Sequence, residues 1–582
     1  MIILGIKLTH DGSLALIDNG RLVFSYEMEK LNNFPRYSEF CISMEEVQDI
    51  LGLYGYTLDQ MDRIVVDGWF KEGLATDKFA LSFLSNNLPV RIGVNQTADY
   101  GHFVKPDENI LEPQRFYFEK ENFSYNSYMH VSGHVAGAYC SSPFSGKKLD
   151  SFVLVWDGGM TPQLFYYEYD QNKVSNLGSL FMLTGDIYML IACTFKPFNS
   201  GKPEMSVAGK AMAYVAVGNI HDAILKGYRE IYDDLIRECA GAHWSIDVVY
   251  NIKAKFLEKT RILYEENSFT DEDMLTTFQY FIDRLLLEKL EEKMMQLPGK
   301  ERNICLSGGC ALNIKWNNSI RASKIFNRVW TPPFPNDSGS AIGTACCEMM
   351  MHHGIKTLEW SVYSGPPIRK KSLSGFGSDE TNYFERYLSM ECTLMELAAV
   401  LHTYDEPVVF LNGRAELGPR SLGNRSILSS ASSPDMKRRL NEMKKREHYR
   451  PVAPICIEEK AQEIFFPGTA DPYMLYEHFI KPEWKGKIPA ICHLDGSARL
   501  QTINENENLT VYTLLKHYFK ISGIPVLCNT SANLNGSGFF PDVESAMKWG
   551  WANLIWSDSV LFVKKDWPQS KSFSEKIRQA AS

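Results

Sequence analysis

Short apolar runs separated by polar turns open the chain and predict strands. Residues 1–7 predict a buried strand, 14–17 a second and 21–26 a third, joined by polar turns at 9–13 and 18–20. The second turn, Asp-Asn-Gly, is typical of a β-hairpin. The chain therefore begins as a small sheet with polar residues in its first turn.

The same design returns near residue 150. Residues 151–157 form an apolar run that ends in an acid and is followed by two glycines, and 63–67 predict another strand. Strand, polar turn and strand resemble the opening of actin-like ATPases and sugar kinases, in which the turn faces a phosphate. Many mixed sheets also begin with hairpins, so the repeated pattern by itself indicates only a duplicated sheet.

Two histidines four residues apart predict a metal site. On a helix, His130 and His134 would lie on one face, one turn apart, which suits a shared metal ion. The alternative is a pair of surface or packed histidines. Asp157 and Asp337 are candidates for further ligands; alternatively, Asp157 caps a turn and Asp337 caps the small-residue helix that follows it.

A glycine turn at 307–309 predicts an anion or nucleotide site in the first half of the chain. It joins an apolar strand to a helix start near Asn313, which places the backbone N–H groups of Gly308 and Gly309 at a helix N-terminus. Lys210 follows a stretch broken by glycine and proline. It is a candidate to meet an anion, and the alternative is an ordinary surface lysine.

The remaining pattern divides the chain. The charged region 250–297 predicts a helix with an exposed face. Around 351–366 the pattern lapses, and the Gly-Pro-Pro at 365–367 is typical of a domain boundary. A helix near 394–403 and a strand at 407–411 open a second domain, and the residues after 564 form a polar tail.

Arginines cluster in the second domain, in the stretch 414–426. Arg414, Arg420 and Arg425 alternate there with glycines around a single proline, and a second basic cluster follows at 444–450. Arginine offers a rigid fork of donors for phosphate and carboxylate, and glycine lets a ligand approach the backbone closely. We therefore predict one polyphosphate site; the alternative is a solvated basic face.

Composition narrows the class of protein. At 582 residues with 45% hydrophobic and 23% charged residues, the chain predicts a globular protein of more than one domain. The net charge of −9 gives no global sign of nucleic-acid or membrane binding. Twelve cysteines without a Cys-x-x-Cys pair indicate buried thiols of a reducing compartment, and neither a signal peptide nor a spanning helix is predicted. We therefore expect a cytoplasmic protein with no membrane partner.

The order of motifs resembles the O-carbamoyltransferases, which include the nodulation-factor, cephamycin and tobramycin enzymes. The motifs are His-Asp-x-Ser, His-x-x-x-His, strand-Asp-Gly, Gly-Lys-x-Met, Ser-Gly-Gly-x-x-x-Asn, Asn-Asp-x-Gly, Gly-Pro-Arg-x-Leu-Gly-x-Arg-Ser, Lys-x-Arg-Glu-x-x-Arg-Pro and Asn-Thr-Ser. They run from residue 5 to about 563, and the Gly-Pro-Arg and Lys-x-Arg-Glu blocks are the most specific.

The resemblance implies an α/β chain of two functional parts. Residues 1–358 would form an actin-like domain with duplicated subdomains, similar to the enzyme that transfers threonylcarbamoyl to tRNA. Residues 366–565 would form a mixed α+β domain similar to threonylcarbamoyl-adenylate synthase, followed by the polar tail 566–582. The second domain would make carbamoyl-adenylate from carbamoyl phosphate and ATP. The first would pass the carbamoyl group to a hydroxyl beside a divalent metal, iron(II) in the family, with Mg²⁺ as a further candidate cation.

The match to the family also implies roles for individual residues. The adenylate site would comprise Arg420, Lys444, Arg450 and Arg499, supported by Arg414, Arg425, Arg446 and Ser531. The metal ligands would be His130, His134, Asp157 and Asp337. Lys210, Gly308, Gly309 and Asn313 would hold the nucleotide in the first domain. His10 would deprotonate the acceptor hydroxyl; the alternative is a turn-capping histidine.

Two departures from the family pattern concern the ligands. The usual Glu-Glu-Glu-Arg run near residue 27 is replaced by Glu27-Met-Glu-Lys30 and then 31–37, in a region that commonly borders the acceptor. The loop 529–541 lacks the usual Gly-Glu-Pro, which leaves the details of adenylate binding open. Because the region near residue 27 commonly borders the acceptor and differs here, we expect an acceptor different from those usual in the family.

The sequence is compatible with three functions. The acceptor is a hydroxyl of a small natural product or sugar, or the hydroxymethyl group of a modified pyrimidine such as 5-hydroxymethylcytosine in DNA. The altered segment 27–37 and the basic face 437–450 favour DNA, and the net charge of −9 opposes it. A non-catalytic, actin-like nucleotide-binding regulator would not need the arginine blocks. The resemblance also implies a homodimer.

Overall fold

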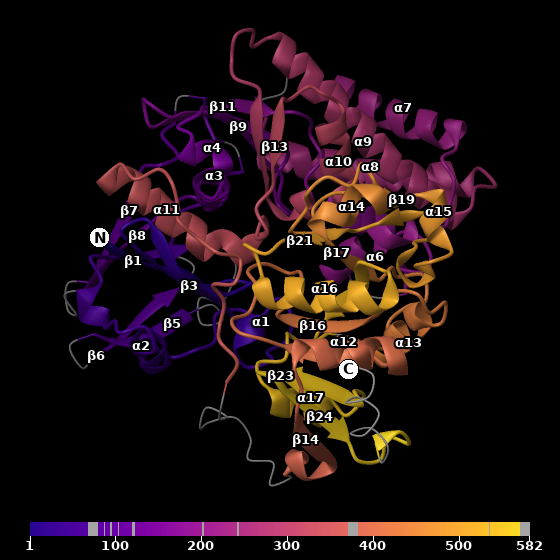
Figure 1. Cartoon of the computed structure of the whole chain (residues 1–582). Coiled ribbons are helices and arrows are strands. Elements are labelled where there is room, and N and C mark those ends of the chain that lie inside the picture. Colours follow the sequence, from indigo (N-terminus) through magenta and orange to yellow (C-terminus); the bar gives the residue numbers. More distant parts are fainter. Residues whose placement is uncertain are drawn as a thin grey trace. The chain divides into compact units, whose positions relative to one another are not determined.

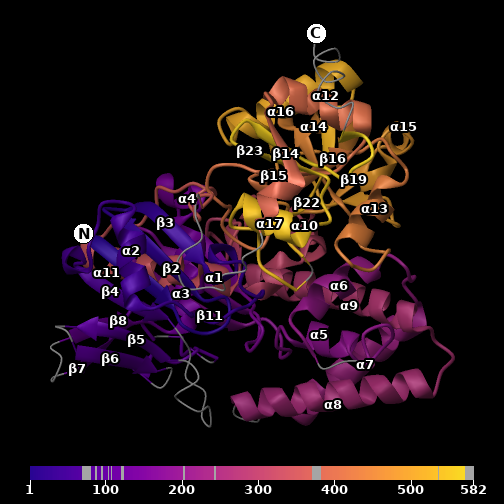
Figure 2. The same cartoon turned by 90° about the horizontal axis from the view of Figure 1, so that it is seen from below.

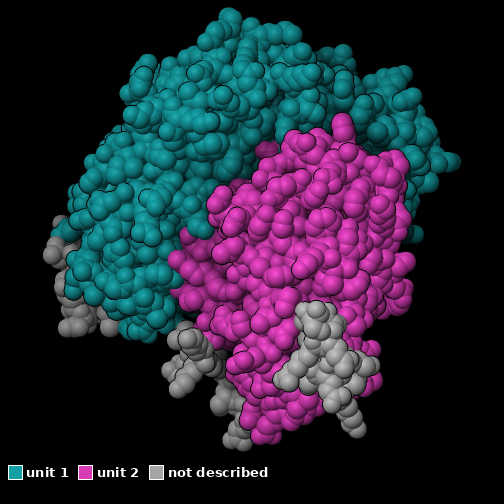
Figure 3. Space-filling view, in the orientation of Figure 1, with its two compact units in different colours: residues 1–25, 38–361 teal, residues 26–37, 362–582 magenta. Residues whose placement is uncertain are grey.

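The computed structural model covers the chain in two compact units. The residues that it describes are 1–67, 80–85, 88–93, 96–102, 104–106, 108–118, 123–200, 203–240, 244–369, 382–534 and 536–570. Unit 1 consists of residues 1–25 and 38–361, and unit 2 of residues 26–37 and 362–582 (Figure 3). The segment 26–37, which the domain prediction had included in 1–358, thus belongs to unit 2. The predicted tail 566–582 lies outside the described residues from 571 onward.

Unit 1 begins with the sheet that the apolar runs predict. Its order is β3 (Arg21–Glu27), β2 (Ser13–Asp18), β1 (Ile2–Lys7), β4 (Arg63–Asp67), β8 (Phe123–Ser127) and β7 (Gln114–Phe118) (Figure 1). Strand β1 pairs antiparallel with β2 and parallel with β4. Helix α2 (Met44–Gly52) begins at Ser43, whose side chain and that of Glu46 form a capping box.

A second sheet of unit 1 repeats this arrangement. Its order is β11 (Lys173–Ser179), β10 (Gln163–Glu168), β9 (Ser151–Val155), β12 (Asn303–Ser307) and β13 (Arg328–Trp330). Strand β9 pairs antiparallel with β10 and parallel with β12, as β1 does with β2 and β4. The two sheets therefore share one pairing pattern, as a duplicated sheet would, and the prediction of an α/β chain is confirmed.

Two helices lie between these sheets and contact each other. Helix α11 (Ser340–His353) packs on β1, β2 and β4, whereas α3 (His130–Cys140) packs on β9 and β12. The helices approach so closely that a Cβ at Gly343 would lie 2.1 Å from the carbonyl oxygen of Gly133. Glycine is required at this crossing, which brings the start of α3 and the start of α11 together.

A helical layer completes unit 1. The charged region 250–297 contains most of α8 (Ile246–Glu265) and α9 (Asp271–Met295), and α7 (Asp222–Glu238) packs on both of them (Figure 2). Side chains at their N-caps fix two starts: Ser245 accepts from Val248 N–H, and Thr270 accepts from Asp273 N–H. The shorter helices of this unit are α4 (Pro143–Gly146), α5 (Ile187–Ala192), α6 (Ser206–Tyr214) and α10 (Ile314–Ala322).

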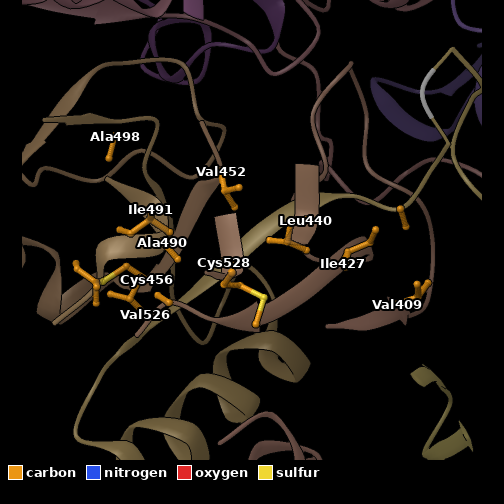
Figure 4. Packing of buried hydrophobic residues seen from close by; sticks show 14 of the residues in the cluster. Val409, Ile427, Leu440, Val452, Cys456, Ala490, Ile491, Ala498, Val526 and Cys528 are labelled. Atoms are coloured by element: carbon orange, nitrogen blue, oxygen red, sulfur yellow. The ribbon is translucent and has the colours of Figure 1, made fainter. Parts of the chain in front are cut away.

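Unit 2 is built on one mixed sheet. Its order is β14 (Tyr387–Glu391), β24 (Val560–Lys564), β23 (Leu554–Ser557), β15 (Val408–Leu411), β16 (Arg425–Ser430), β22 (Val526–Ser531), β17 (Ala453–Ile457) and β21 (Gln501–Ile503). Helices α12 (Leu394–Tyr404) and α16 (Leu509–Ser522) pack together, and buried residues of both share a core cluster with strand residues such as Val408. A second cluster contains Val409, Ile427, Leu440 and Cys528 (Figure 4). The sheet is thus buried on both faces.

The helices give no sign of a membrane span. Within the described residues, none combines the length and the apolar character that crossing a bilayer requires. All twelve cysteines are free thiols, and Cys305 and Cys528 are buried in their sheets.

Candidate functional site

The predicted metal ligands come together in unit 1. His130 and His134, one turn apart at the start of α3, join Asp157 after β9 and Asp337 just before α11. One ligand atom of each residue lies within 4.8 Å of the others, and all four residues are buried. The close packing of α3 on α11 explains how residues so far apart in sequence converge.

The two imidazoles point at each other and at Asp337. Nε2 of His130 lies 3.2 Å from Nε2 of His134. Oδ1 of Asp337 lies 3.3 Å from the first nitrogen and 3.6 Å from the second. Two ring nitrogens and a carboxylate that face one point form a donor set for a divalent first-row metal. The residues present therefore fit the metal that the resemblance implies.

Two residues behind the ligands hold this geometry. Asp67 Oδ2 lies 3.0 Å from Nδ1 of His130, so Nε2 is directed toward the ligand group. Lys7 Nζ lies 3.0 Å from a carboxylate oxygen of Asp67 and 3.0 Å from Asp337 Oδ2. Both are fully buried, and they are in register at the ends of the parallel strands β1 and β4.

The net charge of this group of buried residues favours a bound cation. With both imidazoles neutral, as metal ligands are, the carboxylates of Asp67, Asp157 and Asp337 and the ammonium of Lys7 give a balance of −2, which a divalent ion would neutralise. Burial and Lys7 lower the pKa of His130, but Asp337 and Asp67 outweigh them and raise it to about 9. The surroundings thus favour positive charge at this point.

Asp157 is positioned by a tyrosine and a glycine turn. Its Oδ2 accepts a hydrogen bond from Tyr100 Oη at 2.5 Å, and its Oδ1 accepts from Gly309 N–H at 2.7 Å. Gly308 has a φ of +85°, and a Cβ there would lie 2.4 Å from the carbonyl oxygen of Trp156. The Ser-Gly-Gly turn therefore orients a predicted metal ligand, while its own predicted role in nucleotide binding stays a prediction.

His10 lies at the edge of the metal-ligand group. Its Nε2 is 3.6 Å from Asp337 Oδ2, and its Nδ1 is 3.0 Å from Asp11 Oδ2. Burial lowers the pKa of His10, but Asp337 and the hydrogen bond to Asp11 raise it above its usual value. The side chain is 30% exposed, so it borders the buried ligands and remains accessible.

The two remaining candidates of unit 1 lie on helices. Asn313 caps α10, accepting from Lys315 N–H at 3.2 Å and Trp316 N–H at 3.4 Å, and its Nδ2 donates to Gln279. Lys210 is half-buried on α6. Their assignment to a nucleotide stays a prediction.

In unit 2, the strand register gathers the predicted cations at one edge of the sheet. The start of β16 pairs with the end of β22, whose Asn529 pairs with the start of β17. The start of β17 in turn lies beside that of β21 in parallel. The segments next to these strand ends carry the residues that we call the unit 2 cation cluster: Arg420, Lys444, Arg446, Arg450 and Arg499.

The loop that carries Arg420 is organised by a buried carboxylate. Glu416 Oε1 accepts hydrogen bonds from Leu422 N–H at 2.7 Å, Asn424 N–H at 2.7 Å and Arg425 N–H at 3.1 Å. Glu416 is 0% exposed. One side chain therefore fixes the whole Gly-Pro-Arg corner.

Lys444 binds the loop at the end of β22. Its Nζ donates to Ser531 Oγ at 2.7 Å and to Asn533 Oδ1 at 2.6 Å. Arg446 Nη1 donates to Thr530 Oγ1 at 3.3 Å. The predicted residue Ser531 and two of the predicted cations are thus joined.

The cations of the cluster repel one another in a desolvated place. Burial and then Arg446 and Arg450 lower the pKa of Lys444 well below its usual value. Burial and then neighbouring arginines also lower the pKa of Arg420, and they lower that of Arg499 to about 10. Nε of Arg499 and Nη2 of Arg446 are buried and donate no hydrogen bond within the described residues. Burying several positive charges together costs free energy of folding when no anion is bound. Such a group is typical of a site for a strongly charged anion.

Arg414 and Arg425 have structural contacts instead. Arg425, 2% exposed, donates to the carbonyl oxygens of Asn412, Gly413, Asn424 and Pro366. Arg414 donates to the carbonyls of Ser364 and Gly365. Both clamp backbone around the corner, and their predicted support of ligand binding stays a prediction.

Sequence reasoning missed several residues of these sites. Lys7 and Asp67 were recognised only as strand ends, although a charged residue that closes a fully apolar run is a signal for such a site. Glu416 lay within the arginine stretch, but a lone acid among arginines indicates an ordinary ion pair. Nothing local marks Tyr100.

The comparison with known families decides the class of the protein. The family description "Carbamoyltransferase N-terminus" matches residues 2–346, and "Carbamoyltransferase C-terminus" matches residues 399–555. The chain belongs to the carbamoyltransferase family. The suspected family and the prediction of an enzyme are therefore confirmed.

Relatives of this carbamoyltransferase match it over nearly their whole length. Nodulation protein U of Rhizobium tropici is 43% identical over 585 residues, covering 97% of this chain and 96% of the relative. Nodulation protein U of Sinorhizobium fredii is 41% identical over 577 residues, covering 97% and 99%. The 3'-hydroxymethylcephem-O-carbamoyltransferase of Streptomyces clavuligerus is 30% identical over 561 residues, covering 94% and 96%.

Proposed function

We propose that this carbamoyltransferase makes carbamoyl-adenylate from carbamoyl phosphate and ATP in unit 2, and that unit 1 transfers the carbamoyl group to a substrate hydroxyl. The observation that carries the proposal is the unit 2 cation cluster, in which desolvated arginines and a lysine gather at one sheet edge. A site for one phosphate group would not need so many cations. A site that binds the triphosphate of ATP beside a second anion would need them to neutralise the combined negative charge.

Formation of carbamoyl-adenylate takes two chemical steps. Carbamoyl phosphate loses its phosphoryl group to water and leaves carbamate and phosphate. A carbamate oxygen then attacks the α-phosphorus of ATP, a new P–O bond forms, and pyrophosphate leaves. Apart from water, every reactant and product is anionic, so fixed cations offset the repulsion and stabilise the charge that moves to the leaving group.

Individual residues of unit 2 have distinct tasks in this step. Arg420, Arg450 and Arg499 would bind phosphate oxygens through their forked donors. Lys444, held by Ser531 and Asn533, would act as a point charge at the end of β22. Glu416 would keep the loop of Arg420 in place without meeting the ligand.

Unit 1 supplies the groups for transfer. His130, His134, Asp157 and Asp337 would hold a divalent cation, iron(II) by resemblance, which would supply a Lewis acid when bound. His10, beside Asp337 and accessible, would take the proton of the acceptor hydroxyl as its oxygen attacks the carbamoyl carbon and AMP leaves. The repeated sheets of unit 1 support the actin-like fold that the resemblance implies.

We infer that the acceptor is a small hydroxylated molecule. In support, one relative is named for a hydroxymethylcephem. The DNA alternative rested on the altered segment 27–37, which belongs to unit 2, and on the basic face 437–450. There, Arg438 is paired with Asp435 and Glu442, and Arg439 with Glu406. These ion pairs leave less positive charge for a polyanion, so this face gives the DNA alternative little support.

The experiment supplies carbon-labelled carbamoyl phosphate and ATP to the metal-loaded protein, with and without acceptors. The acceptors are a panel of sugars and hydroxylated metabolites, and hydroxymethylated duplex DNA. We expect pyrophosphate and labelled carbamoyl-adenylate without acceptor, and label in a small acceptor. Folded protein that forms neither product would overturn the proposal, and label in DNA alone would replace the acceptor.

A further inference from the structure

A segment from the N-terminal part of the chain is built into unit 2. Residues 26–37 follow β3, contain α1 (Met28–Leu31) and are grouped with unit 2. Glu27 Oε1 accepts from Gly418 N–H at 2.7 Å, and Lys30 Nζ, 2.9 Å from Glu27 Oε2, donates to the carbonyl of Glu416 at 2.5 Å. Both side chains are buried. The segment is thus fastened to the loop that carries Arg420.

A second attachment joins the segment to the loop after β22. Gly538 N–H donates to the carbonyl of Phe34 at 2.7 Å, and Arg36 N–H donates to that of Gly536 at 3.4 Å. A Cβ at Gly538 would lie 1.7 Å from the carbonyl oxygen of Glu29, so glycine is required for this contact. The segment therefore connects the two loops that carry Arg420 and Ser531.

Directly after these attachments the backbone turns at Tyr37, the last residue of the segment. This residue has a φ of +64°, a conformation that an aromatic residue rarely adopts. Tyr37 stacks on its neighbour, with the guanidinium carbon of Arg36 5.4 Å from the ring centroid. The Arg36 side chain therefore lies over the Tyr37 ring and is 31% exposed.

Arg36 belongs electrostatically to the cation cluster. Its charge is among the causes, after burial, that lower the pKa values of Arg420, Lys444, Arg450 and Arg499. Within its own segment, Nε of Arg36 lies 3.5 Å from Glu29 Oε2, a longer distance than that of a strong ion pair. A fifth arginine from a distant part of the sequence thus adds positive charge to this buried group of cations.

We propose that Arg36 is a substrate-binding residue of the unit 2 site and contacts a phosphate group of carbamoyl phosphate or ATP. The proposal rests on the proposed function of unit 2. The segment 26–37, which the sequence placed at the acceptor, is here a wall of the adenylate-forming site.

The test compares Arg36→Ala and Arg36→Lys with wild type, and Arg438→Ala is the matched control. Arg438 lies in unit 2 but is 52% exposed and paired with Asp435. Carbamoyl-phosphate-dependent pyrophosphate release gives KM for each substrate separately. The rise in Tm caused by inorganic pyrophosphate gives anion binding without catalysis. The Tm of each unliganded variant checks its fold.

We expect Arg36→Ala to raise KM for one of the two substrates by about tenfold or more, the size of one charge-assisted hydrogen bond. Which KM rises tells whether carbamoyl phosphate or ATP is the partner. The pyrophosphate-induced rise in Tm should shrink, Arg36→Lys should recover part of both effects, and Arg438→Ala should match wild type. Arg36→Ala with wild-type KM values and a wild-type response to pyrophosphate would overturn the proposal, as would loss of kcat alone.

The two proposals fail separately. Wild type that releases no pyrophosphate would refute adenylation, whereas the Tm comparison would still decide whether Arg36 binds an anion. If Arg36→Ala proves less stable than wild type, the comparison of Arg36→Lys with wild type decides, since it keeps the charge and loses the fork.

Discussion

Asp67 Oδ2 lies 3.0 Å from Nδ1 of His130 and thereby directs the Nε2 of that imidazole toward His134 and Asp337. The carboxylate is not itself within the ligand group, but it sets the orientation of a ligand. Asp67 and its partner Lys7 close two neighbouring parallel strands, so the sheet register supplies this support.

Replacing Asp67 should therefore weaken metal binding while leaving the ligands in place. We expect Asp67→Asn to reduce the affinity for a divalent metal by roughly 10- to 100-fold, the usual effect of losing such a partner. Metal titration of the apoprotein measures this. The control is Asp59→Asn, at an exposed residue of the same unit. Equal affinities of Asp67→Asn and wild type would show that the carboxylate does not orient the ligand.

Metal removal should separate the two half-reactions. Chelation should abolish transfer to the acceptor, because all four ligands belong to unit 1. It should leave pyrophosphate formation unchanged when Mg²⁺ is restored for ATP. Both products are measured on one sample before and after chelation, and re-addition of iron(II) should restore transfer. A loss of pyrophosphate formation that iron(II) alone reverses would contradict the assignment.

Glu416 should contribute to stability as well as to activity. Glu416→Gln replaces an acceptor of three main-chain hydrogen bonds with a neutral amide in a fully buried place. We expect a loss of about 2 kcal/mol in the free energy of unfolding of unit 2, seen as a lower Tm in calorimetry. Glu442→Gln, at a 47% exposed position, is the control. An unchanged Tm for Glu416→Gln would mean that the loop is held by other contacts.

The protein should take up a proton at Lys444 when an anion binds. Burial and neighbouring arginines lower the pKa of this lysine in the empty site, and a bound anion would raise it again. Binding should therefore weaken as pH rises through the lowered pKa, because the free site must then be protonated. Calorimetric titration with pyrophosphate in buffers of different ionisation enthalpy measures the uptake, which Lys444→Met should abolish. Uptake that is the same in both proteins would exclude Lys444 as its source.

The sequence predicted well those features that local patterns encode. The hydrophobic pattern predicted the strands β1 to β4, β9 and β12, and the spacing of His130 and His134 predicted that they share one helix face. The arginine blocks indicated a ligand site because a merely solvated basic face would not need the glycines that accompany the arginines. The family resemblance then selected the four metal ligands, which the fold brings together.

Features that depend on long-range packing were not predictable in the same way. Arg36 is hydrogen-bonded through its main chain to Gly536, which lies 500 positions later in the sequence, and the positive φ at Tyr37 has no local signature. Asn313 and Arg425 match motif positions, yet their donors and acceptors serve backbone and helix caps. A motif thus identifies the neighbourhood of a site more reliably than the task of each residue.

The most direct test of the central claim is pyrophosphate release and acceptor labelling in wild type, Arg420→Ala and His130→Ala under identical conditions. Loss of one positioned charge should slow pyrophosphate release by about a hundredfold or more in Arg420→Ala. His130→Ala should release pyrophosphate at the wild-type rate and fail to label the acceptor. Equal loss of both products in both variants would contradict the division of labour between unit 2 and unit 1.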